Sequence, residues 1–338
     1  MGNMKRTRLT SVAVVLLLCF VIMAGGGFAY WRSYLHRPLP ITDPVIVDIR
    51  AGMSLRQVNT LLAQQAGLAH PRLLALWAQQ QGLDRAIRRG EFAISPGMTP
   101  QSALVHLISG QAIQYPVTFI EGTTVREALN TLWTSPKVEN LLASADDASI
   151  LEALESPYEA LEGLLFPDTY FYTAGTSDLE ILRRAQRRLA QVLDQEWENR
   201  ADNLPLQSAY EALILASIIE KESGLLSERE RIAGVFVRRL QRGMRLQSDP
   251  TVIYGMGESF DGNLRRVDLE TSTPYNTYRI NGLPPSPIAM AGRDAIHASL
   301  HPAEEDVLYF VATGDGGHYF SVSLDEHNAA VRRYQQTR

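Results

Sequence analysis

One apolar stretch, Ser208 to Gly224, constrains the fold of this chain more than any other part of the sequence. Between Ala212 and Ile219 the only polar residue is Ser217. An apolar run of this density that does not alternate like a strand predicts a helix buried on most sides. The glycine that follows supplies a helix stop. The stretch therefore predicts the central helix of a domain, ending in Glu220, Lys221 and Glu222.

The last of these residues, Glu222, is the candidate for chemistry. In a helix it projects above Ile218 and Ile219, whereas Glu220 points about 200° away. An apolar surround raises the pKa of a carboxyl, and the negative end of the helix raises it further. A glutamic acid that stays protonated near neutral pH is what a general acid for glycosidic bond cleavage requires. The alternative is that both glutamates reach solvent where the helix surfaces.

Composition and missing motifs exclude several classes of protein. The net charge of −5 argues against a nucleic-acid partner. Cys19 is the only cysteine, so the chain forms no internal disulfide, and cysteine ligands or nucleophiles are not expected. The sequence lacks a phosphate-binding P-loop, a dinucleotide fingerprint and a serine-nucleophile elbow, so no cofactor is predicted.

The histidines do not predict a metal site. His297 and His301 have the i, i+4 spacing of ligands on one helix face, but no H-E-x-x-H motif accompanies them and Pro302 follows at once. His318 comes directly after the glycine-rich turn 314–317. We assign it to capping that turn rather than to lining a cleft.

The N-terminal segment predicts where the protein works. Residues 9–31 form an uncharged run of 23 residues, which is long enough for a helix that spans a bilayer. The basic residues of the tail 1–8 place the N-terminus on the cytoplasmic side. They are Lys5, Arg6 and Arg8. The alternative is a signal peptide cleaved near Gly27–Ala29; the length of the run favours an uncleaved single-pass anchor. Everything after Arg32 is then expected outside the cytoplasmic membrane.

A small module is expected next. The segment 32–44 contains three prolines and predicts a short, stiff tether. After it, a strand, a glycine turn, a Ser or Thr N-cap and a helix follow one another three times, with strands at 45–49, 91–94 and 117–120. A second helix at 71–81 gives the section 45–95 the order strand, helix, helix, strand. This order resembles that of a LysM-type sugar-binding module, so we predict a LysM-like βααβ module over 45–115.

The rest of the chain, 116–338, predicts a larger mixed α/β domain around the central helix, which makes the chain α+β in class. About forty residues after Gly255 have no periodic pattern, and their aromatic and proline content indicates an ordered, functional loop. The C-terminal part predicts a hairpin and a last helix to about residue 335. Further helices are expected at 138–161, 178–197, 227–243 and 292–300.

Polar and aromatic residues gather in two segments after the central helix. Tyrosine rings beside amides and hydroxyls are what a carbohydrate groove uses. Asp249 is also explained as the N-cap of a short helix with Pro250 at its first position. The candidate substrate-binding residues are Gln247, Ser248, Asp249, Tyr254, Tyr275, Asn276, Thr277 and Tyr278.

Five long motifs, collinear along the chain, carry a resemblance to a known family. They are E-G-L-L-F-P-D-T-Y (162–170), I-I-E-K-E-S (218–223), R-L-Q-S-D-P-T-V-I-Y-G (245–255), T-P-Y-N-T-Y (273–278) and G-L-P-P-S-P-I (282–288). With them the sequence closely resembles the endolytic murein transglycosylases of the MltG/YceG family. The resemblance covers the whole chain, including the anchor and the LysM-like section.

The resemblance implies a lyase anchored in the inner membrane, with a YceG-type catalytic domain (116–338) in the periplasm and no cofactor. Such enzymes cleave the MurNAc–GlcNAc bond within peptidoglycan strands and leave a 1,6-anhydro-N-acetylmuramic acid end. The family's catalytic glutamate is the second acid of E-K-E, which is Glu222 here. Peptidoglycan synthases as partners, and a role in limiting the length of nascent strands, are further implications.

Two other functions stay open at this point. A muramidase would hydrolyse the same bond and would use Asp249 as a second carboxylate, because hydrolytic glycosidases need two carboxyls whereas intramolecular attack needs one. A non-catalytic anchored scaffold that binds peptidoglycan is the other alternative. The mass of the product separates the two enzymes, since an anhydro product is lighter by one water.

Overall fold

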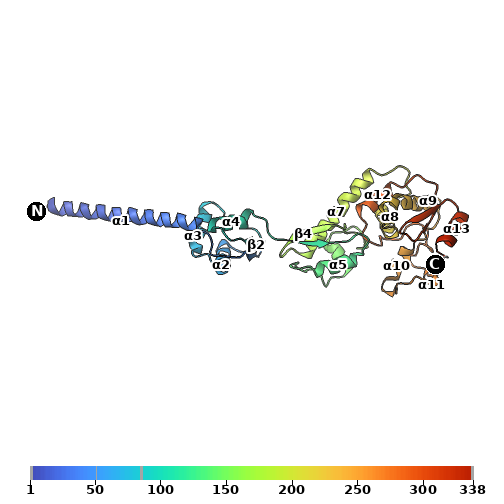
Figure 1. The fold of residues 1–338 in the computed structure, drawn as a ribbon, viewed down its shortest axis with the longest axis horizontal. Coiled ribbons are helices and arrows are strands. Elements are labelled where there is room, and N and C mark those ends of the chain that lie inside the picture. The colour runs from blue at the N-terminus through green and yellow to red at the C-terminus, as the bar shows by residue number, and fades with distance from the viewer. Residues whose placement is uncertain (1–2, 51, 84–86, 336–338) are drawn as a thin grey trace. The chain divides into compact units, whose positions relative to one another are not determined.

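The computed structural model describes residues 3–50, 52–83 and 87–335. The chain divides into two compact units: the first runs to Tyr115 and includes 173–175, and the second holds 116–172 and 176–338. Over these described ranges, helices and three two-stranded sheets make up the two units (Figure 1), so the predicted mixture of helices and strands is confirmed.

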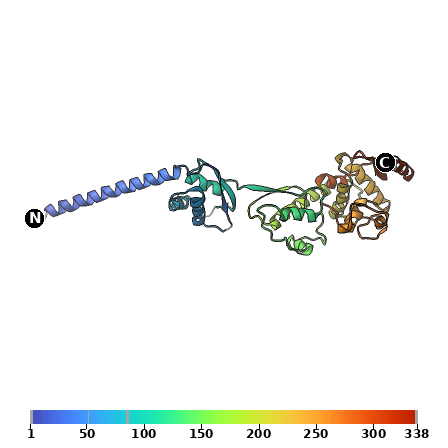
Figure 2. The same cartoon turned by 60° about the horizontal axis from the view of Figure 1, so that its bottom comes forward.

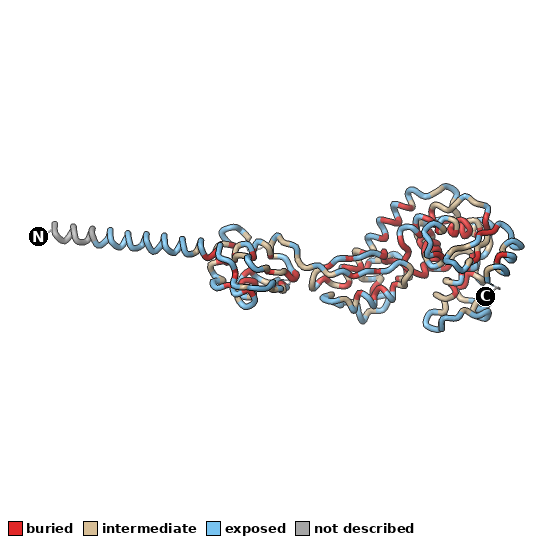
Figure 3. Tube along the Cα trace, viewed as in Figure 1, coloured by how far each residue is buried: buried red, intermediate tan, exposed pale blue. Residues whose placement is uncertain are grey.

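The N-terminal helix α1 runs from Asn3 to His36. Its part from Val12 to His36 has a mean hydropathy of 2.6 and is long and apolar enough to cross a membrane. Figure 3 shows most of this part as exposed. Residues 1 and 2 of the predicted tail lie outside the described residues.

The segment 32–44, for which we predicted a tether, differs in the structure. Its first five residues continue α1, because no proline interrupts the helix before Pro38. Tyr34, Leu35 and Leu39 are buried in the hydrophobic core of the first unit. The apolar helix therefore enters this unit without an extended linker.

The first unit has the predicted order strand, helix, helix, strand. Strands β1 and β2 pair antiparallel with Val47 opposite Phe92, and both side chains are buried. Ser54 begins α2 with a capping box that includes Gln57. The likeness to a sugar-binding module remains a prediction. The elements are β1 (Val45–Ile49), α2 (Leu55–Ala66), α3 (Pro71–Gln80), β2 (Gly90–Ile94) and α4 (Pro100–Ser109).

Strands β3 and β4 pair in a two-stranded sheet, and most of their residues, with the helices that follow them, belong to the second unit. The predicted helix at 138–161 is shorter in the structure: Asp146 caps its start, and the left-handed backbone of Glu155, at φ 53°, follows its end. The elements are β3 (Gln114–Thr118), α5 (Val125–Trp133), α6 (Asp147–Ala153), β4 (Thr169–Thr173) and α7 (Asp178–Glu198).

The predicted central helix is α8, Ala209–Glu222, and every residue from Ala212 to Ile219 is buried. Its one buried hydroxyl, that of Ser217, donates to Ile214 O and accepts from the Ile288 backbone N–H. Helices α7, α9 (Arg229–Gln241) and α12 (Arg293–Leu300) pack around α8 (Figures 1 and 2). This confirms that α8 is the core element of the second unit.

The remaining elements surround this core. The irregular segment predicted after Gly255, residues 257–291, is ordered and holds only the short helices η2 (Gly257–Ser259) and α11 (Arg266–Glu270). The elements are η1 (Leu226–Glu228), α9 (Arg229–Gln241), α10 (Asp249–Met256), η2 (Gly257–Ser259), α11 (Arg266–Glu270), α12 (Arg293–Leu300), β5 (Tyr309–Ala312), β6 (His318–Ser321) and α13 (Leu324–Tyr334).

Candidate active site

Glu222 is the last residue of α8, and its carboxyl lies half-buried at the wall of a cavity of about 500 Å³. The Ser248 hydroxyl donates a hydrogen bond of 2.5 Å to Glu222 Oε1. Burial raises the pKa of Glu222 to about 7, and the negative charge of Asp249 raises it as well. The Ser248 hydrogen bond and the Arg239 charge act in the opposite direction. The carboxyl therefore exists in both protonation states near neutral pH.

A buried network of hydroxyls holds Ser248 in place. The Ser248 N–H donates to Thr277 Oγ1 at 2.9 Å, and Thr251 Oγ1 donates to Ser248 O at 2.7 Å. The hydroxyl oxygens of Thr251 and Thr277 are 2.8 Å apart. All three residues are buried. The network links the start of α10 to the loop 273–278 and fixes the hydroxyl that contacts Glu222.

Gln247 lies next to Ser248 in a left-handed conformation, with φ at 51°. This conformation is uncommon for a residue with a side chain and costs free energy that the surroundings must offset. Here the Gln247 N–H donates to Thr277 O at 3.2 Å, which ties the strained residue to the same loop. Its side chain is exposed and lines the cavity, as does Asp249.

Tyr278 and Asp249 form a second polar pair in this cavity. The Tyr278 hydroxyl donates to Asp249 Oδ1 at 2.6 Å, so one oxygen of this carboxylate is engaged. Burial and Asp249 together raise the pKa of the tyrosine, which keeps it a hydrogen-bond donor. Asp249 itself is exposed. The predicted residues Gln247, Ser248, Asp249 and Tyr278 are therefore brought together at Glu222.

The structure adds residues that sequence reasoning did not place here. Arg239 is buried; its guanidinium donates to Leu308 O at 2.8 Å and to Leu246 O at 2.7 Å. Tyr309 lies beside it, with the guanidinium carbon 5.2 Å from the ring centre. Both line the cavity with Glu222. The pair Arg238-Arg239 resembles a solvated helix face in sequence, and only the packing of β5 against α9 reveals the buried member.

The assignment of His318 to capping the hairpin turn is wrong. Thr313 and Asp315 close the turn by hydrogen bonds with Gly317, whereas His318 lines the cavity of Glu222. Its Nδ1 is 2.8 Å from Glu228 Oε2, and its backbone N–H donates to the other oxygen of the same carboxylate. The partner comes from η1, which no local pattern connects to the hairpin.

Two predicted substrate contacts, Asn276 and Thr277, are fully buried. The Asn276 amide donates to three backbone oxygens and holds the loop together; they belong to Asp268, Leu269 and Thr271. Thr277 belongs to the hydroxyl network below Ser248. These two residues shape the loop rather than line the cavity, because no polar atom of their side chains is left to face it.

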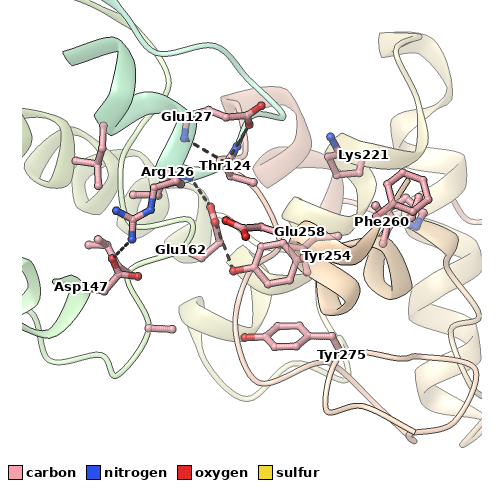
Figure 4. A pocket seen from close by; sticks show the side chains of 18 of the residues that line it. Thr124, Arg126, Glu127, Asp147, Glu162, Lys221, Tyr254, Glu258, Phe260 and Tyr275 are labelled. Carbon is pink, nitrogen blue, oxygen red and sulfur yellow. Dashed lines mark hydrogen bonds and ion pairs between the residues drawn. The ribbon is translucent and has the colours of Figure 1, made fainter. Parts of the chain in front are cut away.

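Tyr254 and Tyr275 line a different cavity, of about 1110 Å³ (Figure 4). Their rings pack edge to face with centres 4.9 Å apart. Glu162 lies in the same cavity: its Oε1 accepts from the backbone N–H groups of Val125 and Gly163, and the Tyr254 hydroxyl is 3.4 Å from its Oε2. Burial raises the pKa of Glu162 to about 7. The second unit thus contains a second carboxyl that titrates near neutral pH.

Glu220 lies away from the cavity of Glu222, as its position on the helix predicts. Its side chain is 5% exposed and forms an ion pair of 2.6 Å with Arg229, which is 6% exposed. Its other oxygen accepts from the Gly292 backbone N–H. Glu220 therefore joins α8 to α9 and α12 inside the core.

One group among the described residues has metal-ligand spacing: Glu196, His297 and His301, whose ligand atoms lie within 4.8 Å of one another. Glu196 accepts from Arg293 at 2.9 Å and is also 2.9 Å from His297 Nδ1. The ring nitrogens of His301 face two backbone oxygens. Hydrogen bonds between α7 and α12 account for this group.

Comparison with known proteins gives the following similarities. The family model described as "YceG-like family" matches residues 47–333. The endolytic murein transglycosylase of Bacillus subtilis strain 168 is 29% identical over 332 residues, which cover 93% of this chain and 91% of that protein. The enzyme of the same name from Streptococcus pneumoniae D39 is 25% identical; the match covers 94% of this chain and 64% of the pneumococcal protein.

A solved structure is similar as well. It is the 2.6 Å crystal structure of a YceG-like protein from Listeria monocytogenes, with a TM-score of 0.51 and 28% sequence identity. The alignment covers 85% of this chain and 99% of that one.

Proposed function

The chain belongs to the YceG-like family, and from this premise we propose that Glu222 is the acid–base residue of an endolytic murein transglycosylase. The activity is that of a lyase which cleaves peptidoglycan glycan strands. The observation that carries the role of Glu222 is its environment: a half-buried carboxyl at the end of a core helix, in a cavity, with a pKa of about 7. Such a group donates and accepts a proton at neutral pH.

The first step of the reaction requires protonated Glu222. Its Oε1 accepts from Ser248, so the proton sits on Oε2 and is donated to the glycosidic oxygen, which stays on C4 of N-acetylglucosamine. The bond from that oxygen to C1 of N-acetylmuramic acid breaks, and positive charge develops at C1. Glu222 becomes a carboxylate, which the Ser248 hydrogen bond stabilises.

The second step returns the proton. The Glu222 carboxylate takes the proton of the C6 hydroxyl on the same N-acetylmuramic acid, and the C6 oxygen forms a bond to C1. The product is a 1,6-anhydro ring, no water is consumed, and Glu222 is protonated again. One carboxyl is sufficient because the nucleophile belongs to the substrate, unlike the two-carboxyl hydrolases.

Asp249 is the observation that favours a second candidate function, hydrolysis of the same bond by a muramidase. It is an exposed carboxylate in the cavity of Glu222, where it would activate water in a muramidase. Its hydrogen bond from Tyr278 favours a role in holding the loop. Mass spectrometry of the products from purified glycan strands tests both functions. We expect anhydro ends; products heavier by one water would identify the muramidase instead.

The wild-type rate should depend on pH through Glu222. Since the acid must be protonated to act, kcat/KM should fall as pH rises above about 7. Ser248→Ala removes the hydrogen bond that lowers the pKa of Glu222, so this alkaline limit should move to higher pH. The rate at the optimum should fall about tenfold, because the carboxylate formed in the reaction loses a charge-assisted hydrogen bond. The pH profile of anhydro-muropeptide formation measures both effects.

Ser286→Ala is the matched control for this prediction. Ser286 is buried too, but its hydroxyl pairs with Tyr275 at the other cavity, 2.7 Å away. This variant should keep the wild-type alkaline limit. If the alkaline limit of Ser248→Ala equals that of wild type, Ser248 does not set the pKa of Glu222 and has no role in the reaction.

Helix α1 is compatible with a membrane anchor, and we infer that it holds the chain in the inner membrane with the N-terminus in the cytoplasm. Protease added to spheroplasts should then degrade residues 37–338 of the bound protein. A protected catalytic domain, or a mature protein that begins near Tyr30, would contradict this topology. Synthase partners and a limit on the length of nascent strands belong to the same proposal.

A further inference from the structure

A groove of about 830 Å³ lies between α2 and α3 of the first unit, outside the sites described above. Three of its lining residues are arginine or histidine: Arg56, His70 and Arg72. None of the described residues that line it is a carboxylate. Both arginines are exposed. The charge of this groove therefore favours an anion.

The N-terminal end of α3 also favours an anion in this groove. The N-cap His70 makes no side-chain cap hydrogen bond in the described structure, and Pro71 occupies the first helical position. The N–H groups of the first turn are therefore not capped by a side chain, and this end of the helix carries partial positive charge. Because His70, Pro71 and Arg72 line the groove, the positive helix end opens into it.

Asn59 indicates that a ligand of the groove should also carry a hydrogen-bond donor. It lines the groove and is 1% exposed. Its Nδ2 donates to Pro71 O at 3.2 Å, whereas its Oδ1 is buried without a hydrogen-bond partner among the described residues. A buried acceptor without a donor destabilises the fold, so a small turn of the Asn59 amide that lets a ligand hydroxyl donate to this oxygen is favourable. The groove thus combines an anion site with an acceptor for a hydroxyl.

Two residues that line the groove contact the apolar helix. The Tyr30 hydroxyl is 2.8 Å from His70 Nε2, and Trp31 Nε1 donates to Leu73 O at 3.2 Å. Tyrosine and tryptophan at the end of an apolar segment mark the membrane interface. The first turn of α3 therefore lies beside the interfacial end of α1.

The distribution of charge along the chain agrees with a membrane surface as partner. Residues 9–115 carry eight Lys and Arg against four Asp and Glu, while 116–338 carry 21 against 33. Only the first of these stretches is attracted to an anionic bilayer. Exposed Leu76, at 53% exposure, lines the groove and provides an apolar contact.

We propose that the groove between α2 and α3 binds the headgroup of an anionic phospholipid that carries free hydroxyls, such as phosphatidylglycerol. The phosphate contacts Arg56, Arg72 and the start of α3, and a headgroup hydroxyl donates to Asn59 Oδ1 after the Asn59 amide turns toward the groove. The inference rests on the proposed anchoring by α1. A murein glycan fits less well, because its disaccharide unit offers no phosphate to the two arginines.

The test uses the full chain in neutral detergent, with phosphatidylglycerol or phosphatidylcholine added and bound lipid counted by native mass spectrometry. Wild type should retain phosphatidylglycerol and not phosphatidylcholine. Arg56→Gln/Arg72→Gln should weaken retention about thirtyfold, which corresponds to about 1 kcal/mol for each arginine near an anionic lipid. The matched control, Arg50→Gln/Arg88→Gln, removes the same charge from exposed positions outside the groove and should bind like wild type.

Several outcomes overturn the proposal. The first three are an equal loss of phosphatidylglycerol retention in both double variants, no loss of retention in Arg56→Gln/Arg72→Gln, and equal retention of the two lipids by wild type. The fourth is displacement of the bound lipid by inorganic phosphate or by murein fragments at the same concentration. Flotation with neutral vesicles separates this test from the anchor. A chain that floats but shows no lipid preference refutes the groove alone, and a chain that does not float refutes the anchoring.

Discussion

Glu222→Gln should lower the yield of anhydro-muropeptides by at least about 10²–10⁴-fold, the usual contribution of general acid–base catalysis. Glutamine keeps the size of the side chain and an oxygen that accepts from Ser248, but it cannot supply the proton or take it back. The measurement is product formation by the folded variant beside wild type.

The control for this prediction is Glu162→Gln. Glu162 is also a glutamate whose pKa burial raises to about 7, but it lies in the other cavity of the second unit (Figure 4). Its glutamine variant still accepts from the Val125 and Gly163 N–H groups and should retain most activity. If Glu162→Gln loses activity and Glu222→Gln keeps it, the acid has been assigned to the wrong cavity.

The stability of Glu222→Gln should differ from wild type in a pH-dependent way. The folded-state pKa of about 7 lies above the ordinary 4.5, so the wild-type fold loses stability as pH rises through this window. Glutamine does not ionise. The variant should match wild type below pH 4.5 and exceed it above pH 7, by up to about 3 kcal/mol. Denaturant unfolding at about pH 4 and about pH 8 measures the difference.

Glu220→Ala should destabilise the second unit by about 3–5 kcal/mol, because it leaves Arg229 buried without its counter-ion. Burial raises the pKa of Glu220 even though Arg229 lies beside it, so the intact pair itself contributes little net stability. The cost arises from removing one partner only. The free energy of unfolding in urea is the measurement.

The double variant Glu220→Met/Arg229→Met provides the check. Since it removes both charges and keeps apolar volume, it should recover most of the loss. Wild-type stability in Glu220→Ala would mean that the ion pair is not desolvated in solution. Specific activity of the fraction that remains folded should change little in either case, because Glu220 does not line the cavity of Glu222.

The parts of this molecule that follow from local pattern could be predicted from the sequence. The apolar run of α8 requires a buried helix, and helical geometry alone places Glu222 and Glu220 on different faces of it. The order strand, helix, helix, strand in the first unit follows from turn and N-cap residues in the same way.

Contacts between distant segments could not be predicted. Arg239 of α9 lines the cavity of Glu222 together with Tyr309 and His318 because the hairpin of β5 and β6 packs beside α9. In sequence, Asn276 resembles a residue that binds sugar. An irregular segment does not reveal that its amide is hydrogen-bonded to the backbone of the loop. The separation of Asp249 from Tyr254 could have been predicted from the sequence, because five residues along a helix place two side chains about 140° apart. In the structure these two residues line different cavities.

Helix α1 continues without a break into the core of the first unit, so it couples the apolar segment mechanically to the module. A tilt or rotation of its apolar part is transmitted to the attached module, since Tyr34 and Leu35 are clamped in the module's core. The consecutive glycines Gly25–Gly27 lie within the apolar part, so bending is easiest there and not at the junction. One residue inserted after Trp31 would turn the module by about 100° around the axis of α1 and shift it by about 1.5 Å along that axis.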